Sequence, residues 1–227
     1  MDLGLTNILR LDAVLLTVKV ASLATAVSFV FAVLCAHLMS RRPFPGRGLA
    51  DAVFTLPIVL PPTVLGYYLL VVIGRRGLIG PLLAQWGINL VFTWQGAVMA
   101  ATLVISPLIY QSARAAFEGV DRNLENAARS LGAGEVQVFL KVSLPLARKG
   151  IAAGTLLAFA RGMGEFGATL MVAGNIPGKT QTMALAIYDA FSAGKDAEAA
   201  ALVALTSGLS LGLLVCAGWL IGRIKRP

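Results

Sequence analysis

Charged residues are scarce in this sequence, in which only 13% of the 227 residues are Asp, Glu, Lys or Arg and 57% are hydrophobic. A soluble domain is nearer a quarter charged, because its surface has to face water. The scarcity of charge therefore excludes an ordinary soluble globular protein.

Cysteine and histidine are almost absent. The two cysteines, Cys35 and Cys216, lie inside apolar runs, and the single histidine, His37, lies near the end of one. We interpret the cysteines as small buried hydrophobic residues and His37 as an interfacial polar residue. No cluster of Cys, Asp or Glu accompanies the histidine, so the sequence predicts neither a disulfide framework nor a metal site, and no cofactor.

A phosphate-binding loop of the form Gly-x4-Gly-Lys-Ser/Thr is also missing, and the nearest approach, in residues 174–180, is one residue short. The chain is therefore not expected to hold ATP itself. No nucleophile, base and orienting group are brought together by any motif, so we predict no catalytic residue. Any energy for work has to come from a partner.

Long uncharged segments are what the sequence has in abundance. Residues 20–40, 52–74, 77–113 and 199–222 contain no Asp, Glu, Lys or Arg, and about 20 apolar residues in a helix cross about 30 Å of hydrocarbon. We predict an all-α polytopic membrane protein. Its five spans are expected at 15–39, 51–74, 95–117, 150–173 and 198–222, joined by loops at 40–50, 75–94, 118–149 and 174–197.

Two further apolar pieces, 77–93 and 181–193, are too short or too polar to span. The second carries Met183, Ile187 and Phe191 at helical spacing. Both are predicted to form short helices at the outer surface or dipping into it.

The net charge of +8 fits a membrane protein better than a nucleic-acid-binding one, because no basic patch is interleaved with aromatics. With the N-terminus outside, the inner segments hold twelve Lys and Arg residues and the outer segments five. Cationic residues collect on cytoplasmic loops, so we predict the N-out/C-in orientation. Arg41 and Arg42 follow the first apolar run instead of preceding it, which indicates a retained span and not a signal peptide.

The loop 118–149 carries the clearest pattern. Within LENAARSLG (124–132), an apolar stripe of Leu124, Ala127, Ala128 and Leu131 shares one helical face. Gly132 and Gly134 are expected to end that helix. A second short helix then leads to Leu144–Pro145, which is expected to close the unit before the next span.

This loop resembles the EAA loop of bacterial ABC importer permeases, which reads Glu-Ala-Ala, three residues, Gly, nine residues, Ile, one residue and Leu-Pro. Asn126 stands where the pattern has Glu, Glu125 comes one residue early, and Val142 replaces Ile. In that family the loop forms a coupling helix that docks on a cytoplasmic ATPase. The resemblance implies a set of ATPase-coupling residues: Asn126, Ala127, Ala128, Gly132, Val142, Leu144 and Pro145.

Three more segments narrow the resemblance, namely LPIVLPPTVLG (56–66), GRRGLIG (74–80) and ARGMGEFGA (160–168). Together with the loop they look like the molybdate ABC transporter permeases, over about residues 12–222, although sulfate and tungstate permeases share much of the pattern. The resemblance implies one type I importer transmembrane domain, 1–227, in the cell inner membrane among its lipids. It also implies a homodimer of two permease copies, two P-loop ATPase subunits and a periplasmic oxyanion-binding protein.

Two segments suggest a translocation pathway. Pro57, Pro61 and Pro62 should break the second span, and broken helices persist at membrane depth only where protein or a water-filled cavity satisfies them. That span is therefore expected to face the interior, the alternative being a kinked helix facing lipid. Arg161 and Glu165 lie at i, i+4 near the middle of the fourth span, as a gate or as a structural clamp. The candidate pathway residues are Thr55, Pro57, Pro61, Pro62, Thr63, Gly66, Arg161, Glu165, Gly167 and Thr169.

Two other classes of protein remain as alternatives. An ion-coupled secondary transporter would need internal repeats and ion ligands at the bilayer midplane, whereas the sequence offers one intramembrane Arg–Glu pair and no visible repeat. A non-transporting membrane scaffold would not need prolines and glycines inside two spans.

Overall fold

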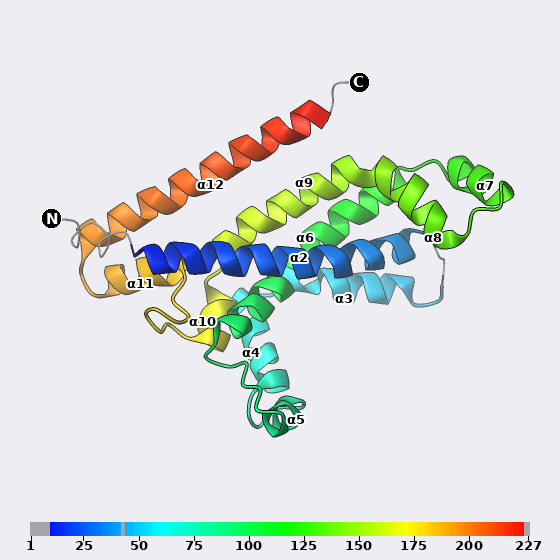
Figure 1. Cartoon of the computed structure of the whole chain (residues 1–227). Coiled ribbons are helices and arrows are strands. Elements are labelled where there is room, and N and C mark those ends of the chain that lie inside the picture. Colours follow the sequence, from blue (N-terminus) through cyan, green and yellow to red (C-terminus); the bar gives the residue numbers. More distant parts are fainter. Residues whose placement is uncertain (1–9, 42–43, 225–227) are drawn as a thin grey trace.

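The computed structural model describes residues 10–41 and 44–224, and every regular element within these ranges is a helix (Figure 1). The predicted all-α class is confirmed. Among the described residues, four helices are long and apolar enough to cross a membrane, and one bent pair of helices brings the number to five. Arg42, Lys225 and Arg226, which enter the orientation prediction, lie outside the described residues, as do the side chains of Cys216 and Arg223.

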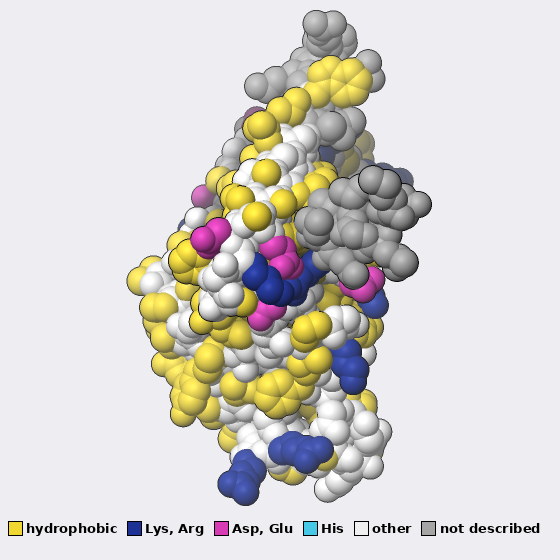
Figure 2. All heavy atoms as spheres, turned by 90° about the vertical axis from the view of Figure 1, so that its left-hand side faces the viewer, with side chains coloured by type: hydrophobic (Ala, Val, Ile, Leu, Met, Phe, Trp, Pro, Cys, Tyr) yellow, Lys and Arg dark blue, Asp and Glu magenta, His cyan; other side chains and the backbone are white. Residues whose placement is uncertain are grey.

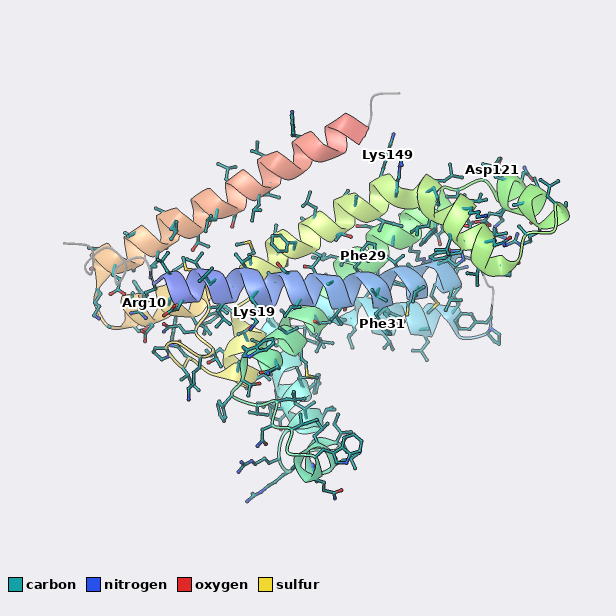
Figure 3. All side chains as sticks on the ribbon, viewed as in Figure 1. Arg10, Lys19, Phe29, Phe31, Asp121 and Lys149 are labelled. Atoms are coloured by element: carbon teal, nitrogen blue, oxygen red, sulfur yellow. The ribbon has the colours of Figure 1, made fainter. Side chains whose placement is uncertain are left out.

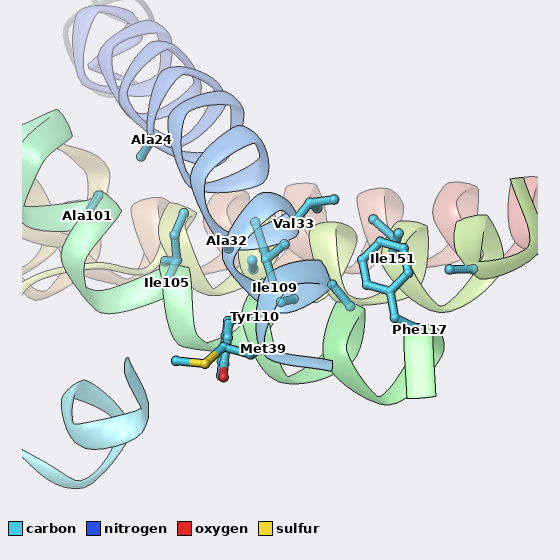
Figure 4. Close-up of a cluster of buried hydrophobic side chains, with 14 of the residues drawn as sticks. Ala24, Ala32, Val33, Met39, Ala101, Ile105, Ile109, Tyr110, Phe117 and Ile151 are labelled. Carbon is cyan, nitrogen blue, oxygen red and sulfur yellow. The ribbon is translucent and has the colours of Figure 1, made fainter. Parts of the chain in front are cut away.

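The bundle is built on three long helices, α2 (Leu11–Arg41), α6 (Trp94–Glu118) and α9 (Leu144–Met163). Small buried residues such as Ala24 and Ala32 of α2 face Ala101 and Ile105 of α6 (Figure 4). Lipid supplies no hydrophobic drive for helices to associate, so close backbone approach through small residues is the usual solution. The predicted first and third spans are confirmed to within a few residues.

The contact between α6 and α9 relies on glycine. A Cβ added to Gly150 would stand 2.7 Å from the Cβ of Ala116, and one added to Gly154 would collide with the side chain of Ser112. Real Cβ atoms do not tolerate such distances. The two helices therefore pack at a separation that only glycine at these positions allows.

The second span is broken, as predicted, into α3 (Arg47–Val59) and α4 (Pro62–Ile73), which are bent by 117°. Leu60 and Pro61 are extended, because a residue that precedes a proline is pushed out of the helical region. Pro62 starts α4, where a missing N–H costs nothing. The prediction that Pro57 also breaks the helix is wrong, since α3 continues through it.

The fourth span differs from the prediction of 150–173. Here α9 ends at Met163, and a separate short helix, α10 (Gly167–Ala173), follows after a break. Toward its start, α9 continues from α8 (Glu135–Val138) and the π-helical turn η1 (Phe139–Ser143), so one helical run covers 135–163.

This run passes through the Leu144–Pro145 pair, so the prediction that the pair ends the loop is wrong. The N–H of Leu144 bonds to the carbonyl of Phe139, five residues back. The wider π turn accommodates a proline that an α-helical ladder would not.

The remaining helices are α5 (Gly80–Gln85), α7 (Arg122–Ser130), α11 (Met183–Ser192) and α12 (Asp196–Ile224). The short helices α5 and α11 lie within the two predicted short pieces. The fifth span, α12, packs on α11 and α9 near its start and then diverges from the bundle (Figure 1). Leu211, Val215 and Trp219 on its surface are exposed and apolar, as a lipid-facing helix requires.

The molecule has two distinct ends. Helices α7 and α8 project beyond one end of the bundle, while α11 lies at the other (Figure 1). Figure 3 places Arg10 and Asp121 at these opposite ends, with Phe29 and Phe31 leaving α2 between them. The loops 118–149 and 174–197 thus lie at opposite ends, as expected for opposite sides of a membrane.

Candidate functional site

Helix α7 is a short amphipathic helix outside the bundle. Asp121 caps it, its Oδ1 accepting a hydrogen bond from the N–H of Asn123 at 2.9 Å. Along the predicted apolar face, Leu124 is 50% exposed and Leu131 is 88% exposed, and Ala127 is exposed while Ala128 is partly covered. The apolar face expected from the sequence is thus uncovered at Leu124, Ala127 and Leu131.

The turn after α7 explains the glycine in the motif. Gly132 has φ +86°, which L side chains rarely adopt. The N–H of Gly132 donates to the carbonyl of Arg129, and the N–H of Ala133 donates to the carbonyl of Ala128. These two bonds form a Schellman motif, in which the left-handed position favours glycine. The chain direction after α7 is therefore set by Gly132.

Asn126 lies on the exposed side of α7, and its Oδ1 accepts a hydrogen bond from Arg129 at 2.9 Å. Arg129 also donates to both carboxylate oxygens of Glu135, at 2.7 and 3.1 Å. The hydrogen bonds to the Glu135 carboxylate raise the pKa of Arg129, so the guanidinium keeps its charge. The polar side of α7 is thereby tied to the start of α8.

The other predicted coupling residues lie on the run that follows. Val142 and Leu144 are half-buried, and Leu144 packs on the main core, whereas Pro145 is exposed. The motif therefore separates into an exposed part, on α7 and its turn, and a supporting part, on η1 and α9.

Glu125, whose role the sequence pattern left open, faces inward. Its side chain is 2% exposed, its Oε1 lies 2.8 Å from Nη2 of Arg41, and the same oxygen accepts a hydrogen bond from Ser143 at 2.5 Å. Position 125 lies off the stripe formed by Leu124, Ala127 and Leu131, but the exposed Asn126 and Arg129 do so too, so local spacing gave no signal of its burial. The identity of its partners, on other helices, was not readable from the sequence.

Four of the predicted pathway residues come together where α4 crosses α10. A Cβ on Gly66 would lie 2.7 Å from the Cβ of Met171, and one on Gly167 would lie 3.2 Å from both Pro62 and Thr63 side-chain carbons. The two short helices therefore approach to backbone distance through glycine. Pro61 precedes this crossing.

The two other threonines of the set have different surroundings. Thr169 is buried in α10. The hydroxyl of Thr55 on α3 donates to the carbonyl of Asp51 at 2.9 Å.

Helix α3, with Thr55 and Pro57, has no buried residue in the single chain. The expectation that this half of the second span faces the interior of the transporter stays a prediction, because burial within one chain does not test it. Polar contacts fix α3 to α6: Tyr110 donates to Oδ1 of Asp51 at 2.7 Å, and Arg114 pairs with the same carboxylate.

Arg161 and Glu165 form the predicted ion pair, with Nη1 2.9 Å from Oε2. They do not lie mid-helix as expected, because α9 ends at Met163 and Glu165 stands in the break before α10. The other carboxylate oxygen accepts a hydrogen bond from the N–H of Ala168 at 3.0 Å. These contacts join the end of α9 to the start of α10, and the side chain of Arg161 remains 39% exposed.

A polar cluster at the opposite end was missed by the sequence analysis. Arg10 donates to Glu198 and to Gln181, both at 2.8 Å, and pairs with Asp189 at 3.2 Å. Figure 2, which faces this end, shows basic and acidic side chains gathered among apolar ones. The cluster joins the start of α2 to α11 and α12.

Comparison with known proteins agrees with the fold. Residues 28–226 match the family described as the binding-protein-dependent transport system inner membrane component. The chain is 49% identical over 217 residues to the molybdenum transport system permease protein ModB of Escherichia coli (strain K12), covering 95% of this chain and 94% of that protein. It is 33% identical to the sulfate transport system permease protein CysW of Synechococcus elongatus, over 95% of this chain and 75% of that one.

Among solved structures, a chain of the inward-facing MetNI methionine ABC transporter superposes with a TM-score of 0.75 at 17% identity, over the full length of both chains. This likeness shows the fold of an ABC importer membrane subunit and confirms the predicted fold class. The relatives are named as permeases, which agrees with the prediction of a transport subunit and not an enzyme. On these grounds the chain belongs to the binding-protein-dependent transport system inner membrane components.

Proposed function

We propose that this protein is the membrane-spanning permease subunit of an ATP-binding cassette importer that carries molybdate across the inner membrane. The identity of 49% to a molybdenum permease over nearly the whole chain supports this substrate. The lower identity to a sulfate permease makes sulfate an alternative cargo. Tungstate is another, because it is a tetrahedral dianion like molybdate.

The observation that carries the proposal is the placement of α7. Its exposed apolar face stands beyond the bundle, and the helical run 135–163 leads from beside it into the membrane without interruption. A partner that moves α7 can therefore move a helix whose far end carries Arg161. Docking of a cytoplasmic ATPase on Asn126, Ala127, Ala128 and the Gly132 turn would use this connection.

The proposed assembly contains two permease copies, two P-loop ATPase subunits and a periplasmic binding protein that delivers the anion. Exposed apolar side chains on α3, such as Leu49, Val53 and Val59, offer surface for lipid or for the second copy. ATP binding draws the coupling helices together and opens the pathway outward, and hydrolysis reverses the change. Alternating access of this kind is a two-state equilibrium that ATP shifts.

The pathway is proposed to bind the anion weakly. A conduit that held a dianion with fixed cations would trap it, because a site has to release what it binds. Here Arg161 is neutralised by Glu165 at 2.9 Å. Thr63 and Thr169 are proposed to offer transient hydrogen bonds, and selectivity is assigned to the binding protein.

The test is uptake of radioactive molybdate at trace supply in a strain that lacks this gene. Uptake should be lost and should return with the gene on a plasmid, and sulfate uptake should be unchanged. The purified permease alone should show no tight molybdate binding by calorimetry. Unimpaired molybdate uptake in the deletion strain, or a tight site on the isolated permease, would contradict the proposal.

A second measurement separates the importer from an ion-coupled transporter or a scaffold. The protein purified from its native membrane should bring a P-loop ATPase with it in stoichiometric amount. Transport in proteoliposomes should need ATP and persist when ion gradients are collapsed. Transport driven by an ion gradient without ATP would favour the secondary transporter.

A further inference from the structure

Helix α7 is anchored through a single buried side chain. Of its nine residues only Glu125 is buried, at 2% exposure. The apolar residues Leu124 and Ala127 of the helix are exposed, and Ala128 is only partly covered. The side chain that holds α7 in place is thus a carboxylate. The helices that this carboxylate contacts are the ones that a movement of α7 would displace.

Two membrane helices meet at this carboxylate. Arg41, the last residue of α2, lies with Nη2 2.8 Å from Oε1 of Glu125. Ser143, the last residue of η1, donates its hydroxyl to the same oxygen at 2.5 Å. Since η1 runs directly into α9, Glu125 joins α7 to two spans of the bundle at once.

Longer contacts align the same elements. Arg122, the first residue of α7, donates to the carbonyl of Ser40 at 3.4 Å, and Arg41 donates to the carbonyl of Val120 at 3.4 Å. The end of α2 is therefore held against the start of α7 from both directions.

Burial makes this link firm. Separating a buried ion pair leaves a charge without solvent or partner, which is costly, whereas an exposed ion pair can open at little cost. Arg129–Glu135, in the same loop, is of the second kind, because its side chains are 37% and 66% exposed. Of these two ion pairs of α7, only the one at Glu125 resists displacement of the helix.

We propose that Glu125 is a positioning residue that transmits displacement of α7 to α2 through Arg41 and to the run 135–163 through Ser143. The proposal rests on the proposed function, in which an ATPase moves α7. Asn126 occupies the position of Glu in the resembled motif, but it carries no charge. In this chain the carboxylate is on Glu125, one residue earlier, and it faces the permease.

The test uses the full complex of permease, ATPase and binding protein in proteoliposomes. Glu125→Gln keeps the shape and the acceptor for Ser143 but removes the charge that holds Arg41. The ATPase should still co-purify and keep its basal hydrolysis. Stimulation of hydrolysis by the loaded binding protein, and molybdate uptake, should both fall by about tenfold or more, because transmission and not docking is lost.

The matched control is Glu135→Gln, which makes the same chemical change in the exposed ion pair of the same loop. Its uptake should stay within about twofold of the wild type, as expected for a solvent-exposed pair. Ser143→Ala is the second variant, in case Glu125→Gln fails to fold. It removes one hydroxyl and should lower stimulated hydrolysis while basal hydrolysis persists.

Several results would overturn the inference. One is full stimulation and uptake with Glu125→Gln. Another is loss of the ATPase from the purified Glu125→Gln complex, which would make Glu125 a docking residue. A third is unchanged coupling in Ser143→Ala when Glu125→Gln does not fold. Absence of an ATPase from the wild-type preparation would instead refute the proposed function itself.

Discussion

The carboxylate of Glu165 meets the backbone N–H of Ala168 at 3.0 Å across the break between α9 and α10. The N-terminal N–H groups of a helix have no partner within it, and at membrane depth water is not at hand to replace one. With Arg161 at 2.9 Å on its other oxygen, this one side chain both caps α10 and neutralises the nearest cation.

Removal of the Glu165 side chain should therefore cost more stability than its conversion to the neutral amide. Glu165→Ala leaves a buried N–H and a guanidinium without their acceptor, and about 1–3 kcal/mol is expected for such a loss. Glu165→Gln is the matched comparison, because it keeps an acceptor for the N–H of Ala168 and leaves no buried charge, whereas Arg161→Ala would leave the buried carboxylate unpaired. Thermal unfolding in detergent should show a clearly lower midpoint for Glu165→Ala. Equal midpoints would argue against the clamp and leave only a role in the pathway.

The contact of α9 with α6 gives a second prediction. Gly154→Ala places a methyl group on the side chain of Ser112, so the helices have to separate. Gly162→Ala is the matched control in the same helix, because its nearest neighbours would lie at 3.6 Å, an ordinary contact. The first variant should lower the unfolding midpoint and the yield of folded protein, by the 1–3 kcal/mol typical of overpacking. The second should resemble the wild type.

The turn after α7 gives a third prediction. Gly132→Ala forces an L residue to φ +86°, at roughly 1–2 kcal/mol, and this redirects the chain after the coupling helix. Gly134→Ala, two residues on, has an ordinary backbone conformation and open space around it. Uptake should fall with Gly132→Ala and stay normal with Gly134→Ala. Equal uptake by both variants would show that the geometry of this turn does not matter to coupling.

Orientation gives a fourth prediction. A cytoplasm-specific reporter fused after Lys149 should be active, and a periplasm-specific reporter fused after Lys179 should be active, as the distribution of basic residues requires. The opposite pattern at either site would overturn the N-out/C-in orientation.

The long spans could be predicted because one physical demand sets their length. A helix of about 20 apolar residues is needed to cross hydrocarbon, so α2, α6 and α12 follow closely from uncharged runs. The breaks were harder, because the effect of a proline depends on its neighbours. Successive prolines after Leu60 force an extended bend, while the π turn before Pro145 lets a helix continue.

The candidate site was predicted in its outer part only. Helical spacing was enough to identify the exposed stripe on α7, since periodicity describes a single helix. The contacts of Glu125 with Arg41, of Gly154 with Ser112 and of Arg10 with Glu198 each join different helices. Such pairings depend on how helices pack, which no local pattern encodes.

The burial of a single residue in α7 has a consequence for how such a subunit changes over time. Its attachment to the permease and its contact surface for a partner use different residues, Glu125 on one side and Leu124, Ala127 and Leu131 on the other. Mutations on the outer side can accumulate without loosening the anchor. Exchange of the outward residues alone for those of a related permease should therefore redirect the protein to a different ATPase. The choice of ATPase can then change, in evolution or by design, without loss of the contacts that hold α7 on the permease.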